Sequence, residues 1–355
     1  MRIQEIGRRL VVGFDGPDVG LEIRFALRDL GAGGVILFTR NYEEPAQLLD
    51  LVRRLRELCV HDRLFVSVDQ EGGTVQRLRG AFTTWPDMAS FAEYGDLEEV
   101  RRFARFLAQE LAAVDIDWNF APVCDVHSNP DNPVIGRRAF ASDAETVSRY
   151  AAAFIEETQR QGVMACAKHF PGHGDTAQDS HLTLPMMDAD APLIEERELA
   201  PFRAAARAEA ASIMTAHVVY PAYEESLPAT LSKKIIGGLA RALPYDGLIV
   251  TDDLEMAAVA SHFDPGEAAV LALNAGCDAL LCCKNVGRQE EIVRGVFDAV
   301  RADRIEHETL LDGDKRLRRA HARFVNRPRP PLSVIGREEH RDLAERVRAA
   351  SDARR

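Results

Sequence analysis

Short apolar runs recur along the chain, separated by longer stretches of mixed polarity. Most of the runs are continuous rather than alternating, which is typical of strands buried on both faces of a parallel sheet. The eight runs are Leu10–Phe14, Gly34–Phe38, Leu64–Val68, Ile116–Val123, Val163–Ala167, Ile213–Val219, Leu248–Val250 and Ala279–Cys283. We therefore expect eight strands, most of them buried on both faces.

The stretches between these runs carry the pattern of amphipathic helices. After the second run, the apolar residues that recur at helical spacing are Leu48, Leu51, Val52, Leu55, Leu58 and Cys59, with Arg53, Arg54, Arg56 and Glu57 on the other face. Pro45 suits the first turn of this helix. The pattern recurs after the eighth run, with Ile292, Val293, Val296, Phe297 and Val300. Alternating strands and helices predict right-handed βαβ units.

Eight such units predict an α/β fold built as a single (β/α)8 TIM-type barrel, which we assign to residues 1–305. A doubly wound open sheet gives a similar pattern and stays an alternative. The remaining residues break the alternation with a helix near His307–Phe324, a Pro-rich link at Arg327–Pro331 and a charged helix near Arg337–Ala350. We interpret residues 306–355 as a short helical C-terminal extension packed on the barrel.

Composition narrows the class of protein. The chain has 355 residues, 46% hydrophobic and 28% charged, which is enough to bury a sizeable core. Its formal net charge of −12 argues against a nucleic-acid partner, because phosphate binding needs a concentrated basic surface. No stretch approaches the roughly 18 apolar residues of a membrane span, and residues 1–9 lack a signal-like run. We expect a cytoplasmic protein without a membrane partner, and a monomer is the favoured oligomeric state.

The six cysteines lie mostly in apolar runs, and none forms a metal-type CxxC pair. We expect them to be reduced and to pack as small hydrophobic side chains. Cys282 and Cys283 would point to opposite faces of a strand.

Polar residues follow several of the apolar runs. They are Asp69–Gly73 after the third run, Asp125 after the fourth, Lys168 and His169 after the fifth, His217 after the sixth, and Asp252 and Asp253 after the seventh. Because the carboxyl ends of barrel strands meet at one mouth, we expect these side chains to converge on one cleft. Arg77 and Arg138 lie on nearby loops.

The segment Lys168–His181 packs three histidines and two carboxylates into fourteen residues. Pro171, Gly172 and Gly174 are not expected inside a stable helix or a central strand, so we predict that these polar groups lie on a loop after the fifth run. Loops fixed to buried strands commonly carry function.

One chemistry for this cleft is metal-dependent hydrolysis. The residues that could be ligands are His169, His173, Asp175, Asp179 and His181. His169 and His173 are separated by a Pro-Gly break, so they do not share a helix face as the paired histidines of helical zinc motifs do.

The other chemistry is glycoside hydrolysis, which needs a carboxylate to attack or stabilise an oxocarbenium-like carbon and a proton donor for the leaving oxygen. Asp252 or Asp253 supplies the carboxylate. A histidine can be the donor, since its ordinary pKa of about 6.5 lets it give and take a proton near neutrality. Asp179, two residues before His181, is placed to orient that imidazole and stabilise its charged form.

Three motifs resemble those of family 3 glycoside hydrolases. They are Lys168–Thr176 followed by Asp179–His181, Val68–Arg77, and Thr251–Met256. Within that family the chain is most similar to bacterial β-N-acetylglucosaminidases (β-hexosaminidases) of peptidoglycan recycling. The resemblance covers roughly Leu10 to Val300, and no motif of the C-terminal extension takes part.

The resemblance implies a retaining exo-enzyme that hydrolyses terminal non-reducing β-linked N-acetylglucosamine, with anhydro-muropeptides as substrates and no metal or cofactor. It implies Asp252 as the nucleophile, His181 as the general acid/base and Asp179 as its dyad partner. The substrate-binding positions that it implies are Asp69, Arg77, Arg138, Lys168 and His169.

Several alternatives stay open. A phosphorylase or a β-glucosidase could use the same barrel, and so could a barrel that binds sugars without cleaving them. Arg77 could instead be a salt-bridge partner of Glu71, while for His173 and Asp175 bracing of the loop is favoured over contact with substrate. The sequence departs from the family pattern at Thr74, where arginine is frequent, at Arg137, where a small or acidic residue is frequent, and at Glu255, where a small residue is frequent.

Overall fold

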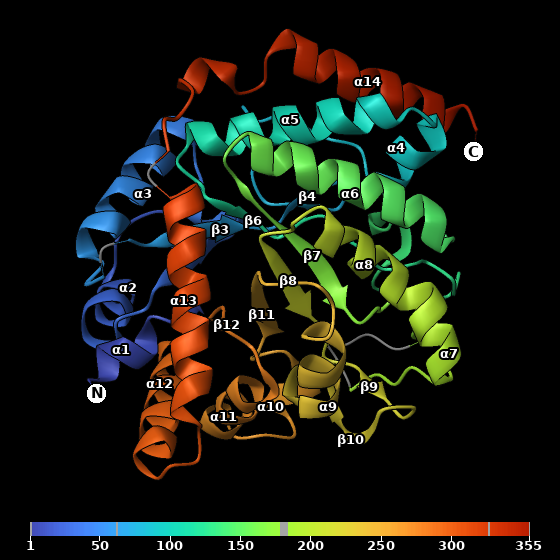
Figure 1. Ribbon diagram of the computed structural model, residues 1–355. Helices are drawn as coiled ribbons and strands as arrows, with labels where there is room; N and C mark the ends of the chain where they lie inside the picture. The colour runs from blue at the N-terminus through green and yellow to red at the C-terminus, as the bar shows by residue number, and fades with distance from the viewer. Residues whose placement is uncertain (1, 62, 178–183, 326, 355) are drawn as a thin grey trace.

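The centre of the computed structural model, which describes residues 2–354 except 62, 178–183 and 326, is a closed barrel of parallel strands (Figure 1). Around the barrel the order is β1 (Leu10–Val12), β12 (Ala279–Cys282), β11 (Leu248–Asp253), β8 (Ser212–Thr215), β7 (Met164–Phe170), β6 (Trp118–Asn119), β3 (Phe65–Val68) and β2 (Gly34–Leu37). β1 pairs in parallel with both β12 and β2, which closes the ring. The predicted (β/α)8 barrel is confirmed, and the open sheet is excluded.

Helices surround this barrel. The longer ones are α3 (Pro45–Leu58), α5 (Leu97–Ala113), α6 (Ala144–Arg160), α8 (Leu199–Arg207), α11 (Pro265–Ala275) and α12 (Val286–Arg301). The shorter helical segments are α1 (Ile3–Gly7), α2 (Leu21–Phe25), η1 (Ala26–Leu30), η2 (Thr39–Asn41), α4 (Met88–Tyr94), η3 (Gly136–Arg138), α7 (Ala191–Leu193), η4 (Ile194–Glu198), η5 (Ala229–Leu231), α9 (Lys233–Ile235), η6 (Ile236–Ala240) and α10 (Ala257–Ala260). Two hairpins, β4 (Gln70–Gly72) with β5 (Val75–Gln76) and β9 (Val219–Tyr220) with β10 (Glu224–Pro228), extend from the strand ends.

Local sequence explains how these helices begin. Asp96, Asp143 and Asn285 stand at the N-caps of α5, α6 and α12, where their side chains accept hydrogen bonds from backbone N–H groups of the first turn. Such caps satisfy donors that have no partner inside the helix. Pro45 occupies the first turn of α3, and the predicted apolar face of that helix is buried from Leu48 to Leu58.

The apolar strands divide their side chains between two cores. Leu10, Val12 and Cys282 pack outward with the surrounding helices, whereas Val11 and Cys283 belong to a second cluster inside the barrel. This alternation explains why the strands are apolar throughout. It also agrees with the prediction that Cys282 and Cys283 face opposite ways, and all six cysteines are free thiols.

Several strands differ in extent from the predicted runs: β8 stops at Thr215, so that Val219 lies in β9, and β11 continues through Asp252 and Asp253. β6 covers only Trp118–Asn119, although an isolated bridge joins Val123 to Lys168 further along. β7 continues through Phe170, so Lys168 and His169 lie in a strand and the prediction of a loop there is wrong. The reason is that the strand-breaking residues begin only at Pro171, while the Lys168 and Phe170 carbonyls still accept hydrogen bonds from neighbouring segments.

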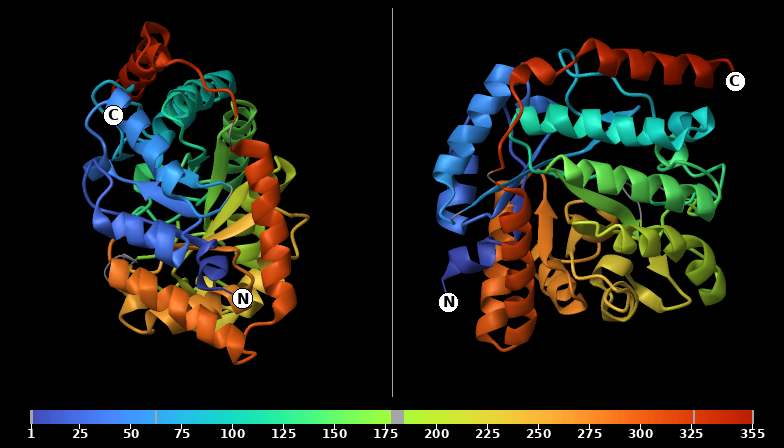
Figure 2. Two further views of the ribbon diagram at one scale, coloured as in Figure 1. Left: turned by 90° about the vertical axis from the view of Figure 1, so that its left-hand side faces the viewer. Right: turned by 45° about the horizontal axis from the view of Figure 1, so that its top comes forward.

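The C-terminal residues form α13 (His307–Phe324), η7 (Leu332–Val334) and α14 (Glu338–Asp352). Leu317, Ala320 and Phe324 of α13 join the cluster inside the barrel next to Phe65 and Trp118, which begin β3 and β6. α13 therefore closes the barrel at the N-terminal ends of its strands. α14 lies along α4 and α5 (Figures 1 and 2). The division at residue 305 stays a prediction.

Among the helices that the structure describes, none has both the length and the apolar character that a membrane crossing requires.

Candidate active site

A cavity of about 310 Å³ opens at the carboxyl ends of the barrel strands. Its polar lining is Asp69, Arg77, Arg138, Lys168, His169, His173, Asp252, Asp253 and Lys284. The structure thus brings together every described residue to which the family resemblance assigned a role, whereas Asp125, Asp175 and His217 do not line the cavity. Asp179 and His181 lie outside the described residues.

Buried ion pairs hold one wall of the cavity. The Lys168 ammonium lies 2.7 Å from Asp69 Oδ1 and 2.6 Å from Glu71 Oε1. Arg138 binds both oxygens of Glu71, at 2.9 and 2.8 Å. Burial opposes charging of Lys168, but the two carboxylates outweigh it, so the pKa of this lysine lies above its ordinary value. These four charges fix one another in a rigid arrangement.

Asp125 organises the histidines. Its Oδ2 accepts from His169 Nδ1 at 2.7 Å, and its Oδ1 accepts from the backbone N–H groups of His169 and His173, at 3.1 and 2.7 Å. Burial opposes ionisation of Asp125, but His169 and these donors outweigh it and lower the pKa of the carboxyl group. The acceptor charge of Asp125 therefore fixes the orientation of the His169 ring, a role that carboxylates play beside catalytic imidazoles.

Asp252 and Asp253 end β11 and differ in charge state. Burial opposes ionisation of Asp252, but the imidazoles of His217 and His169 outweigh it, and the Asp253 N–H donates to Asp252 Oδ1 at 2.8 Å. The pKa of Asp252 is consequently below its ordinary value. Burial raises the pKa of Asp253 to about 7, and the nearby charges of Glu255 and Asp252 contribute in the same direction. Asp252 is therefore ionised at neutral pH, whereas Asp253 is near half-protonation.

His217, two residues after the end of β8, supports this strand end. Its Nε2 donates to the backbone carbonyl of Asp253 at 3.0 Å, and its Nδ1 lies 2.7 Å from Thr230 Oγ1. The sequence placed His217 in the cleft. The structure places it beside the aspartates, where it braces the peptide that follows Asp252.

The described part of the loop after β7 is tightly packed. A Cβ at Gly174 would lie 1.7 Å from the carbonyl oxygen of Val126, so only glycine permits this approach. His173 lines the cavity, with its Nδ1 2.8 Å from Thr176 Oγ1. Asp175 instead pairs with Arg197 at 2.5 Å, which agrees with its interpretation as a bracing residue.

Arg77 also lines the cavity, but its contacts are longer than those of Arg138. Its guanidinium is 3.9 Å from Asp69 Oδ2 and lies over the ring of Phe38, with 5.6 Å from its central carbon to the ring centroid. The alternative pairing with Glu71 is wrong, since Glu71 is bound by Arg138 and Lys168.

Sequence reasoning missed the apolar part of the cavity. Phe38 and Met214 line it, yet only polar residues at strand ends were considered. Phe38 directly follows β2 and could have been found by the same strand-end rule. Glu198 was also missed: it lies buried beneath Gly172, where burial raises the pKa of its carboxyl group to about 7.

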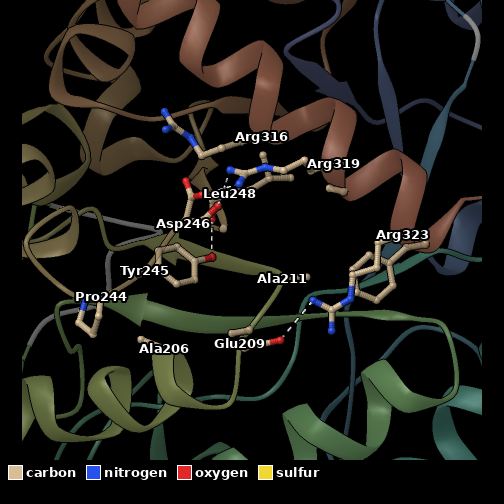
Figure 3. Close-up of a pocket in the computed structure, with 14 residues that line it drawn as sticks. Ala206, Glu209, Ala211, Pro244, Tyr245, Asp246, Leu248, Arg316, Arg319 and Arg323 are labelled. Atoms are coloured by element: carbon tan, nitrogen blue, oxygen red, sulfur yellow. Dashed lines mark hydrogen bonds and ion pairs between the residues drawn. The ribbon is translucent and has the colours of Figure 1, made fainter.

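A second pocket, of about 430 Å³, lies at the opposite end of the barrel, between α13, the end of α8 and the start of β11 (Figure 3). The arginines that line it are each paired with an acid: Arg316 with Asp278, Arg319 with Asp246, and Arg323 with Glu209. None of the predicted site residues lies there. Its size alone therefore does not make it a catalytic site.

The family model for the glycosyl hydrolase family 3 N terminal domain matches residues 8–320. A β-hexosaminidase from Methylococcus capsulatus is 36% identical over 341 residues, which cover 95% of this chain and 98% of that protein.

Solved structures of the same family also match this chain. A glycoside hydrolase family 3 β-N-acetylglucosaminidase from Paenibacillus sp. matches with a TM-score of 0.93 and 38% identity, over 99% of this chain and 69% of that one. NagZ from Neisseria gonorrhoeae, solved in complex with N-trifluoroacetyl-D-glucosamine, matches with a TM-score of 0.80 and 29% identity, over 97% and 98% of the two chains.

Proposed function

The chain belongs to glycoside hydrolase family 3, and on that premise we propose that it removes terminal non-reducing β-linked N-acetylglucosamine with retention of configuration. One observation carries the proposal. Asp252 is a partly buried, ionised carboxylate in the cavity wall, and among the described residues it takes part in no ion pair. Such a carboxylate is suited to attack the anomeric carbon as positive charge develops there.

In the first proposed step, Asp252 attacks the anomeric carbon while protonated His181 donates its proton to the departing oxygen. Asp179 orients the imidazole and stabilises its charge. In the second step, water attacks the glycosyl ester of Asp252 and neutral His181 takes the proton of that water. The roles of His181 and Asp179 rest on the family resemblance. They are supported by His173, which brings the start of the same loop to the cavity.

We assign the binding of sugar hydroxyls to Asp69, Arg77, Arg138, Lys168 and His169. A carboxylate accepts hydrogen bonds from hydroxyl groups, whereas arginine and lysine donate to them. Lys168 and Arg138 are already held by Glu71, so little ordering remains when a sugar binds.

The proposed natural substrates are N-acetylglucosaminyl-1,6-anhydro-N-acetylmuramic acid and its peptide conjugates, degraded in the cytoplasm during peptidoglycan recycling. The NagZ of N. gonorrhoeae, which was solved with an N-acylated glucosamine, supports the sugar. Lys284 supports the leaving group, since it is an exposed cation in the cavity lining and muramic acid carries a carboxylate.

The test uses nitrophenyl β-N-acetylglucosaminide, with the matching β-glucoside as a control for the acetamido group. We expect turnover of the N-acetyl sugar alone. A slow fluorinated N-acetylglucosamine donor should accumulate as an ester on Asp252, identified by peptide mass spectrometry. An adduct on another residue would contradict the assignment of the nucleophile, and preference for the glucoside would favour a β-glucosidase.

Phosphorolysis is the second candidate. The cations that line the cavity favour an incoming anion: Arg77, Arg138, Lys168 and Lys284. A histidine acid/base also carries no negative charge that would repel phosphate. Measuring sugar 1-phosphate against free sugar in phosphate buffer separates the two reactions, and free sugar is the expected product. Activity that survives EDTA would argue against a metal-dependent hydrolase.

A further inference from the structure

Arg137 and Arg138 are consecutive residues of the one-turn 3-10 helix η3, and their side chains bind different partners. The Arg138 guanidinium binds Glu71 at the cavity wall. The Arg137 guanidinium binds Asp87 through Nε at 2.9 Å and Glu93 through a terminal nitrogen at 2.7 Å. A shift of either side chain therefore acts on the short turn that carries both.

The last turn of α14 completes the contacts of Arg137. Ser351 is 2% exposed, and its hydroxyl oxygen accepts from Arg137 at 3.2 Å while its proton goes to Glu93 Oε2 at 2.6 Å. The Ser90 hydroxyl lies 3.2 Å from the Ser351 hydroxyl and 2.8 Å from Asp87 Oδ1. A residue 214 positions along the chain from Arg137 thus joins the network directly behind the sugar wall.

The same network reaches the hairpin that carries Glu71. Asp87, which binds Arg137, caps α4 through the Ser90 N–H. A Cβ at Gly73 would lie 2.7 Å from the Asp87 Cβ, so Asp87 packs against the turn between β4 and β5. Arg138 and its partner Glu71 are therefore both supported by the cluster that Ser351 completes.

α14 is fixed independently at its other end. His340 Nδ1 lies 2.8 Å from Glu110 Oε1, and the Gly336 N–H donates to the same oxygen at 2.9 Å. The His340 ring stacks on Phe106 with 4.3 Å between ring centroids. Because these contacts lie more than three helical turns before Ser351, a change at Ser351 can alter the Arg137 contacts without detaching the helix.

We propose that α14 is a positioning element of the sugar site, and that Ser351 acts through Arg137 to hold Arg138 in place for the substrate. Ser351 touches no substrate and is a positioning residue. The inference rests on the proposed function in one respect, which is that Arg138 contacts the bound sugar. It gives the C-terminal extension a task in substrate binding and accounts for the departure from the family pattern at Arg137.

The experiment is a double-mutant cycle on the full chain with nitrophenyl β-N-acetylglucosaminide. Ser351→Ala should raise KM about three- to tenfold, the range expected for one lost buried hydrogen bond, and should leave kcat within about twofold. Arg137→Met should raise KM at least as much. In the Arg137→Met background, Ser351→Ala should have no further effect, because the two residues act through the same contact.

Arg346→Ala is the matched control, since Arg346 joins the same helix to Glu99 at 3.4 Å and does not contact Arg137. It should leave KM unchanged. Three outcomes would each overturn the proposal: an unaltered KM for Ser351→Ala, additive effects of the two changes, or an equal rise in KM for Arg346→Ala. Melting temperatures of the variants show whether α14 only adds stability. If the wild type does not turn over the substrate, the proposed function fails by itself, and dissociation constants for N-acetylglucosamine across the same variants still test the positioning.

Discussion

The two ends of the barrel use similar charged groups in opposite ways. At the end closed by α13, buried Asp278 lies between Arg316 at 2.9 Å and Arg241 at 2.5 Å, and apolar side chains of α13 pack into the barrel beside them. At the open end, Asp252 is only partly buried and has no ion pair among the described residues, and it lines a cavity.

The difference separates charge that stabilises from charge that is available for chemistry. A buried carboxylate surrounded by arginines is neutralised, and its loss leaves buried cations unpaired. A carboxylate kept ionised by imidazoles and one backbone N–H keeps its negative charge for a substrate. Variants at the open end should therefore lose activity, whereas variants at the closed end should lose stability.

The largest effect is expected for Asp252→Asn. The amide has the same shape and can still accept from the Asp253 N–H, so the melting temperature should change little, whereas kcat should fall at least about a thousandfold. The activity is measured with nitrophenyl β-N-acetylglucosaminide. With Asp252→Ala, added azide should restore turnover and give the α-glycosyl azide, because azide enters from the face that the carboxylate occupied; a β-product would contradict the assigned face.

Asp278→Asn should give the opposite result. Removing one partner of a buried ionic cluster costs about 3–5 kcal/mol, so the free energy of unfolding in urea should fall by that order while kcat below the transition stays unchanged. A variant with normal stability and reduced kcat would contradict the separation of the two ends.

Gly174→Ala probes the loop at the open end. The new methyl group would meet the Val126 carbonyl and displace the loop that leads to Asp179 and His181. A displacement of about 1 Å can cost about a hundredfold in rate, so we expect a loss of that order in kcat with a small change in melting temperature. Gly238→Ala, where no atom lies within 4 Å of the added Cβ, is the control and should behave as wild type.

Asp253→Asn should change catalysis least of these variants, and its effect should be seen in the pH dependence of stability. The folded pKa of Asp253 is about 7, above the ordinary value of about 3.9, so folding favours its protonated form. The raised pKa therefore adds to the free energy of unfolding. This added stability is fully present below the unfolded pKa and is lost as pH rises from about 4 to 7. The steepest slope is about 1.4 kcal/mol per pH unit. The variant should lack this decline in urea unfolding series, and an identical decline would contradict the raised pKa.

Much of the open end could be predicted from the sequence because position along the strands determines it. Asp69, Lys168, His169 and Asp252 come at or next to strand ends, and parallel strands bring such positions to one mouth. Arg138 was placed on a loop near the cleft from the sequence, its substrate-binding role came from the family resemblance, and its binding of Glu71, 67 positions away, became visible only in the fold.

The closed end was less predictable. The stripe of Leu317, Ala320 and Phe324 predicts a helix with one apolar face, but nothing in that spacing says that the face plugs the barrel. Similarly, His217 was placed in the cleft from its strand end, while its contact with the Asp253 carbonyl depends on how two neighbouring strands align. The roles of Asp179 and His181 remain predictions.

Because Cys282 and Cys283 face opposite ways, only one of the two thiols points into the barrel. Cys283 lines the cavity at the carboxyl ends of the strands, so the wall of the candidate active site contains a thiol. Burial raises the pKa of this thiol well above its usual range, and the protonated form is a poor nucleophile toward alkylating reagents and peroxide. We therefore expect purification and assay in air, without added reductant, to leave the activity intact.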